Sequence, residues 1–224
     1  MTNYKSFIRF ASFLGIGAML FDVSLIAVVG YLTPGYDPFT RYISELGAPN
    51  NPYSSLINVW WSVYSFFILV FSIGLYTGIA RSRWSWVGPL VIAAEALANG
   101  ILSGVFSCDI GCSGGSFSND MHRIVSGTGT FISVFIPGLL LLSIMNDGRW
   151  KRMRSFLVTM QVVMISVAIY PFYGEYILMV HGTTYRYVGF FHRLYTVAYY
   201  ISVITPALHL YSLSKASRSR KDLP

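Results

Sequence analysis

Six long apolar segments, separated by short polar connections, make up most of the 224 residues of the chain. A bilayer core about 30 Å thick needs roughly 20 apolar residues per helix, and backbone polar groups in hydrocarbon must be satisfied within such helices. The pattern therefore predicts an all-α, polytopic membrane protein: one domain over residues 1–224, built as a six-transmembrane-helix bundle. The predicted helices cover residues 7–32, 56–80, 84–106, 124–145, 156–173 and 187–213.

Composition and charge agree with this prediction and add an orientation. Hydrophobic residues make up 54% of the chain and charged residues only 11%, which is too apolar for a soluble domain of this length. Of the 16 Lys and Arg residues, all lie on one side of a six-helix arrangement except Arg41, Arg123, Arg186 and Arg193. The positive-inside rule then predicts a multi-pass protein of the cell membrane with both termini in the cytoplasm. The net charge is +7, but no single basic patch is present, so we expect no nucleic-acid partner.

The polar connections on the predicted outer side are the longer ones, and they cover residues 33–54, 107–122 and 174–186. In the first of them, Arg41 and Glu45 are four positions apart, so one helical turn would pair them. Ser44 and Glu45 are adjacent and would not face each other on a helix, which argues against a nucleophile with its base. We expect Arg41, Ser44 and Glu45 to hold this outer surface together or to bind a lipid headgroup or a partner subunit.

The second outer connection contains both cysteines of the chain, Cys108 and Cys112. Outside the cytoplasm such a pair can oxidise, provided that the three residues between them turn tightly. Free thiols are one alternative. Metal ligation together with His122 is another, weakened because zinc sites normally need more ligands than this spacing offers. We favour a structural disulfide, which would pin the loop without carrying out a reaction.

Three of the four histidines, His122, His181 and His192, fall in the outer half of the predicted topology. Three imidazoles, with Asp109 or Glu45 handling protons, could hold a zinc ion that activates water. No His-x-x-x-His or His-Glu-x-x-His pair is present, however, and interfacial histidines also bond to loops or headgroups. We therefore expect no cofactor, with zinc as the alternative, and expect Asp109 and His122 to contribute to the outer binding surface.

Two acids fall inside the predicted membrane helices, where an ionisable group is a functional candidate by default. Glu95 and Asn99 are four residues apart and share a helical face. Asp22 is expected to reach His192 or Arg193 and so to join the first and last helices. Pairing within the bundle is favoured over an ion path, because a path would need a continuous series of such groups.

Three sequence markers together resemble a known family. Tyr42-Ile-Ser-Glu-Leu-Gly-Ala-Pro-Asn-Asn-Pro52 follows the first predicted helix, Gly104-Val-Phe-Ser-Cys-Asp-Ile-Gly-Cys112 follows the third, and His122 opens the fourth. The combination, which extends over most of the chain, resembles the bacterial and archaeal membrane proteins catalogued as domain of unknown function 998. This resemblance implies a compact six-helix bundle with the markers gathered on its outer face, and it implies no established activity or cofactor.

Two more distant similarities suggest hypotheses about the function. The layout is similar to that of the damage-regulated autophagy modulators, and the outward His and Asp residues are similar to those of the alkaline ceramidase superfamily of membrane metal hydrolases. The His-x-x-x-His pair on the last helix of that superfamily is absent here, which leaves only His192. Two hypotheses result. The favoured one is a noncatalytic membrane component whose outer polar cap binds membrane lipid or another membrane subunit, and the alternative is a lipid-directed, metal-dependent hydrolase.

Overall fold

Helices form at all six predicted apolar segments. The structure is a computed structural model that describes residues 2–181 and 186–219, and these residues contain helices and no strands. The α-helices are α1 (Thr2–Leu32), α2 (Ser54–Gly78), α3 (Val87–Glu95), α4 (Ser103–Val105), α5 (Phe117–Val134), α6 (Ile136–Ile144), α7 (Met153–His181) and α8 (Val188–Ser219). Three short 3-10 helices, η1 (Ile43–Gly47), η3 (Ile110–Cys112) and η4 (Gly148–Trp150), and the π-helix η2 (Ala96–Leu102) complete the elements.

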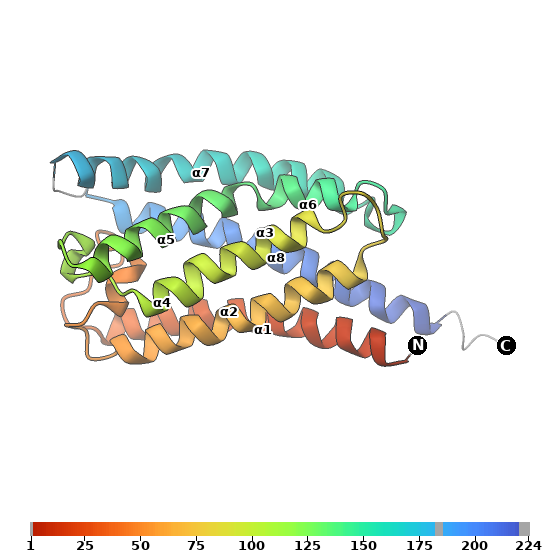
Figure 1. The fold of residues 1–224 in the computed structure, drawn as a ribbon, viewed down its shortest axis with the longest axis horizontal. Coiled ribbons are helices and arrows are strands. Elements are labelled where there is room, and N and C mark those ends of the chain that lie inside the picture. Colours follow the sequence, from red (N-terminus) through yellow and green to blue (C-terminus); the bar gives the residue numbers. More distant parts are fainter. Residues whose placement is uncertain (1, 182–185, 220–224) are drawn as a thin grey trace.

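The helices run up and down an elongated bundle (Figure 1). In it, α3, η2 and α4 follow one another as one column, and α5 and α6 form a second column that bends by 46° at Phe135. The bend is explained by Pro137 in the first turn of α6, which cannot continue the hydrogen bonding of α5. Helix α1 begins and α8 ends at the same end of the bundle, here called the terminal end, and η1 and η3 lie at the opposite end, here called the cap end.

Four helical stretches are long and apolar enough to cross a membrane: Tyr4–Leu32, Ser54–Gly78, Val87–Val105 and Met153–Gly174. The bent pair α5 and α6 makes a fifth if it is one span. Helix α8 does not meet the same criterion, because its tyrosines, serines and histidines lower its hydropathy. The chain is therefore a helical membrane protein with four to five candidate spans by length and composition.

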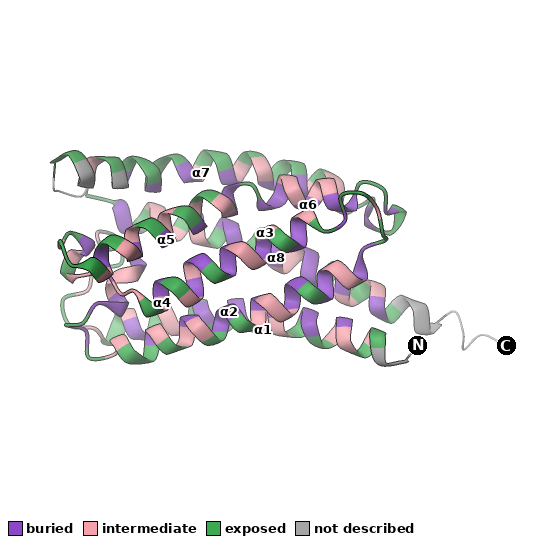
Figure 2. Ribbon diagram, in the orientation of Figure 1, coloured by how far each residue is buried: buried purple, intermediate pink, exposed green. Residues whose placement is uncertain are grey.

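Exposed positions occur along the bundle's helices (Figure 2), and many of them are large apolar residues. Large residues such as Phe13, Val59 and Ile169 are more than 60% exposed, as expected of helices that face lipid. The main apolar core includes Phe71, Leu140 and Leu157, which are fully buried. The exterior and the core thus both agree with a membrane environment.

Two predicted helix boundaries are wrong at the cap end. Helix α5 begins at Phe117 and not at residue 124, because Ser116 caps it: the Asn119 N–H donates to Ser116 Oγ at 3.1 Å. Helix α7 continues to His181 and not to residue 173. The added turns of α5 are mostly polar, whereas those of α7 resume an apolar run at residues 176–180 after Gly174 and Glu175.

An acidic residue ties two helices together at the terminal end. Asp147 is 4% exposed and accepts hydrogen bonds from the Ala80 N–H (2.8 Å) and from Arg149 Nε and Nη2 (2.9 and 2.6 Å). Arg149 also donates to the Gly78 carbonyl, the last residue of α2 (2.9 Å). Burial raises the pKa of Asp147, but the hydrogen bonds from Arg149 and Ala80 outweigh it, so that the pKa lies below its usual value.

Candidate functional site

A cavity of about 750 Å³ extends from the cap end toward the middle of the bundle, and it is the candidate site. Its walls come from α1, η1, α2, α3, η2, α4, α5, α7 and α8, so that elements distant in sequence contribute to one space. Many of its lining side chains are polar, including Asp22, Ser44, Tyr64, Glu95, Asn99, His122, Arg123, Thr130, Ser133, His192, Tyr195, Tyr199 and Tyr200.

Asp22 lies at the deep end of the cavity on α1 and is 2% exposed. Its Oδ1 accepts a hydrogen bond from Trp60 Nε1 at 2.7 Å, and its Oδ2 accepts one from the Tyr200 hydroxyl. The predicted contact of Asp22 with His192 or Arg193 is therefore wrong, because these two side chains bond to the cap instead. Asp22 does link α1 to α8, but through Tyr200, which lies farther along α8.

Glu95, the second buried acid, ends α3 and is also 2% exposed. Asn99 Nδ2 donates to Glu95 Oε1 at 3.1 Å, which confirms the predicted pairing across one turn. The Tyr199 hydroxyl donates to the other carboxylate oxygen. The π-helix η2 begins directly after Glu95, and π-helical turns are frequent at functional sites.

Four tyrosines surround the two acids, and none of them was predicted as a site residue. Tyr199 and Tyr200 each bond to one acid, and Tyr195 donates to the Thr130 carbonyl at 2.9 Å. Tyr64 from α2 faces the same space and is 6% exposed. The available signal was the cluster of three tyrosines in the middle of an apolar helix, since a buried tyrosine hydroxyl needs a hydrogen-bond partner.

Near the cap end the cavity wall holds Ser44, His122 and His192. His122 Nδ1 lies 2.7 Å from the Phe106 carbonyl, which can only accept, so this nitrogen carries the proton. His192 Nδ1 accepts a hydrogen bond from the Ile43 N–H at 3.5 Å. His181 lies in the last turn of α7, is exposed and does not line the cavity.

The predicted metal site of His122, His181 and His192 is therefore not assembled. Among the side chains that the structure describes, no three His, Cys, Asp or Glu residues come together in a way that could hold a metal ion. Two of the histidines share the cavity wall, and the third belongs to a different surface.

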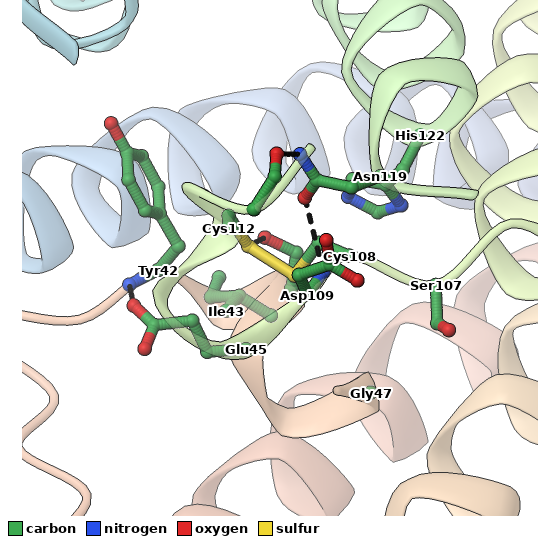
Figure 3. Close-up of a disulfide and its surroundings, with 12 residues drawn as sticks. Tyr42, Ile43, Glu45, Gly47, Ser107, Cys108, Asp109, Cys112, Asn119 and His122 are labelled. Atoms are coloured by element: carbon green, nitrogen blue, oxygen red, sulfur yellow. Dashed lines mark hydrogen bonds between the residues drawn. A yellow bond between two sulfur atoms is a disulfide. The ribbon is translucent and has the colours of Figure 1, made fainter. Parts of the chain in front are cut away.

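The first cap loop is held together by Glu45, the first catalytic candidate. The Tyr42 N–H donates to Glu45 Oε1 at 2.9 Å (Figure 3), and Arg41 Nη1 lies 3.9 Å from Glu45 Oε2, so the predicted Arg41–Glu45 pair is present. Burial raises the pKa of Glu45, while the Tyr42 N–H, Arg41 and Arg193 oppose that rise. Arg41 and Glu45 line a separate hollow of about 160 Å³ at the cap and not the main cavity.

The two cap loops meet at the disulfide between Cys108 and Cys112 (Figure 3). Gly111 and Cys112 adopt φ angles of +70° and +51°, which makes the tight turn that the bridge requires. Cys112 Sγ lies 3.3 Å from Ser44 Oγ, and because a disulfide sulfur carries no proton, Ser44 is the donor. The bridge thus connects the second loop to η1.

Asp109, the second catalytic candidate, organises the second cap loop. Its carboxylate accepts hydrogen bonds from the Ser116 N–H at 3.1 Å and from Ser116 Oγ at 2.7 Å, and its own N–H donates to Asn119 Oδ1 at 3.0 Å. It does not line the main cavity. These contacts position the loop at the N-terminus of α5.

Arg193 was predicted to lie within the membrane, but it bonds to the cap. Its Nη1 donates to the carbonyls of Pro38 (2.6 Å), Arg41 (3.0 Å) and Gly189 (3.0 Å), and its Nη2 donates to the Tyr36 hydroxyl. The Phe190 N–H adds a bond to the Phe39 carbonyl at 3.0 Å. The N-terminus of α8 is therefore fastened to the first cap loop, which forms the roof of the cavity.

These features define a helical membrane protein with a buried polar cavity beneath a disulfide-pinned cap. The family model described as a protein of unknown function (DUF998) matches residues 16–209. Because this match covers most of the chain, the chain belongs to that family, as the three sequence markers predicted. No curated protein and no solved structure matches the chain.

Proposed function

We propose that this protein is a noncatalytic membrane component with six transmembrane helices and both termini in the cytoplasm. Its cavity, which opens on the extracytoplasmic half of the bilayer, binds the polar head of an amphipathic molecule that enters from the membrane. The hydrolase alternative is not proposed, because Asp109 is bonded within its own loop and His181 lies away from His122 and His192.

The six-span topology is supported by the length and position of α8. Its 32 residues correspond to roughly 48 Å at 1.5 Å per residue, more than the hydrocarbon thickness of about 30 Å. It packs against α1 and α7 along the bundle. The orientation is supported by the basic residues near the terminal end, such as Arg81 and Arg152, and by the disulfide at the cap end, which favours an oxidising compartment.

The orientation predicts how introduced cysteines react in intact cells. Lys215 lies near the end of α8 and Asn50 lies in the first cap loop, and both are exposed. We expect a membrane-impermeant maleimide to label Asn50→Cys in intact cells and Lys215→Cys only after lysis, with both variants made in the otherwise native chain. The reverse labelling pattern would show that the termini lie outside the cytoplasm.

The observation that carries the binding proposal is a cavity with a polar deep end and an apolar side wall. Ile124 of α5 and Phe172 of α7 line the cavity and are 60% and 37% exposed. Helices α5 and α7 contact each other at few positions, and we therefore place the ligand's entry between them. A ligand that places a polar group near Asp22 and an apolar chain between α5 and α7 would match both parts.

Filling the cavity is expected to remove the ligand. A Cβ atom at Gly127 of α5, which lines the cavity, would meet no atom within 4 Å, so Gly127→Phe projects a ring into the space without a backbone clash. We expect this variant to retain about tenfold less phospholipid, equivalent to about 1.4 kcal/mol. The measurement is native mass spectrometry of protein released from nanodiscs of phosphatidylethanolamine and phosphatidylglycerol.

Gly17→Phe is the matched control. Gly17 is also a half-buried helical glycine with no atom within 4 Å of an added Cβ, but it does not line the cavity. It should retain lipid as the native chain does. Equal retention by the native chain and both variants would place the bound lipid outside the cavity and contradict the proposal.

A further inference from the structure

The deep end of the cavity brings two carboxylates into one buried space. Asp22 comes from α1 and Glu95 from the end of α3, and each is 2% exposed. Both line the cavity and lie close enough to interact electrostatically. Two negative charges at such a position in a membrane are mutually unfavourable unless a positive charge accompanies them.

The cavity wall supplies no such positive charge at this depth. Among the described lining residues, Arg123 is the sole Lys or Arg, and it lies in the second turn of α5, near the cap end. The neighbours of the acids are neutral donors: Trp60 and Tyr200 bond to Asp22, and Asn99 and Tyr199 bond to Glu95. These four bonds use one acceptor position on each carboxylate oxygen, and each oxygen can accept a second.

An independent observation at the same place points to a ligand. Tyr64 is 6% exposed and faces the cavity, and within the part of the chain that the structure describes its buried hydroxyl makes no hydrogen bond of acceptable geometry. Tyr199 lies beside it, but the two hydroxyls do not meet hydrogen-bond geometry. A buried hydroxyl without a partner is costly, and a polar group placed between Tyr64 and the two acids would satisfy it.

We propose that the amphipathic ligand carries a basic nitrogen and that this ammonium group binds between Asp22, Glu95 and Tyr64. This inference rests on the proposed function. An ammonium has three donors, which match one free acceptor position on each carboxylate and the oxygen of the tyrosine hydroxyl. Its charge balances the acids, and its apolar chain leaves between α5 and α7. The chemical class is a long-chain amine or an amine-bearing lipid.

The test compares amphiphiles that differ only in the head group. The full-length protein in phosphatidylcholine nanodiscs is loaded with dodecylamine, dodecanol or dodecyl phosphate at equal mole fractions, and the bound amphiphile is counted by native mass spectrometry. We expect the native chain to retain the amine about tenfold more than the alcohol, as one charge-assisted contact predicts. This comparison needs no variant and does not depend on the folding of one.

Variants then locate the nitrogen. Asp22→Asn and Glu95→Gln should reduce the preference for the amine to less than about twofold, against about tenfold for the native chain. Tyr64→Phe removes a hydroxyl that makes no hydrogen bond of acceptable geometry to the described residues, so it should weaken retention of the amine and leave retention of the alcohol unchanged. Glu45→Gln, at the cap and outside the main cavity, is the acidic control and should keep the native preference.

The outcomes separate this inference from the proposed function. Equal retention of the amine and the alcohol by the native chain, or a preference for the phosphate, overturns the inference. If Gly127→Phe then retains neither the amine nor the alcohol, the proposed function still stands. If the native chain retains no more of any amphiphile than Gly127→Phe does, the inference and the proposed function are both wrong. If butylamine competes as well as dodecylamine does, the nitrogen site stands and the membrane origin of the ligand is wrong.

Discussion

Gly189→Ala is expected to lower the free energy of unfolding by about 3 kcal/mol or more, the largest effect that we expect of a single methyl group in this chain. An added Cβ would lie 2.3 Å from the Arg41 carbonyl oxygen and 2.6 Å from that of Pro38. Both are backbone atoms, so no side-chain rotation relieves the clash, and α8 must move away from the first cap loop. Thermal unfolding in detergent should show a fall in Tm of roughly 10 °C.

Gly127→Ala is the matched control, because its Cβ would meet no atom within 4 Å. Alanine has the higher helix propensity, so this change should leave Tm unchanged or raise it slightly. A similar Tm for the two alanine variants would show that the N-terminus of α8 does not pack closely against the cap loop.

Arg193→Met should cost about 2 kcal/mol, because it removes the charged donor of three hydrogen bonds between α8 and the cap. The carbonyls of Pro38 and Arg41 would lose their bonds to the guanidinium, and Tyr36 would lose its bond to Nη2. Arg193→Lys should recover only part of the loss, since an ammonium does not reproduce the planar fork of donors. The measurement is again Tm in detergent.

Arg41→Met offers the comparison within the same loop. The Arg41 side chain is 45% exposed and its distance to Glu45 is 3.9 Å, so the expected cost is below about 1 kcal/mol. Should both methionine variants lose the same stability, general loss of positive charge at the cap would explain the result, and the specific role of Arg193 would be wrong.

The fold was predictable from the sequence wherever burial in lipid dictates composition. Each of the six apolar segments coincides with a helix or a column of consecutive helices. The first turns of α5 were missed, because there the helix is stabilised by its Ser116 cap and not by an apolar pattern. The last turns of α7 were missed although residues 176–180 are apolar, because Gly174 and Glu175 interrupt the pattern before them. Helix α8 was predicted as a span from its apolar residues, although the polar side chains that serve the cavity lower its hydropathy.

The site was predictable residue by residue, but not as an arrangement. Asp22, Glu95 and His192 were identified because polar groups stand out in apolar segments, and all three line the cavity. Arg193 directly follows His192, yet it bonds to the cap loop. Hydropathy gives the depth of a residue along a helix and not the direction in which its side chain points.

The tyrosines of the cavity were not predicted as site residues, although they belong to the site. Tyr199 and Tyr200 are as central to the cavity as the acids to which they bond, but a tyrosine in a membrane helix is also typical of an interfacial anchor. Only the arrangement of α8 beside α1 and the end of α3 shows that their hydroxyls meet Asp22 and Glu95. The carboxylates could be predicted as sites, whereas their partners required the three-dimensional structure.

The π-helix η2 allows the column of α3, η2 and α4 to present Glu95 to the cavity and its glycines to α2. A π-helical turn closes over one residue more than an α-helical turn, and the Ser103 N–H accordingly bonds back to the Ala98 carbonyl. One extra residue rotates α4 by about 100° relative to α3. Glu95 can therefore face the cavity while Gly100 and Gly104 pack closely against α2. Deletion of one residue from this stretch is therefore expected to turn either Glu95 away from the cavity or the two glycines away from α2.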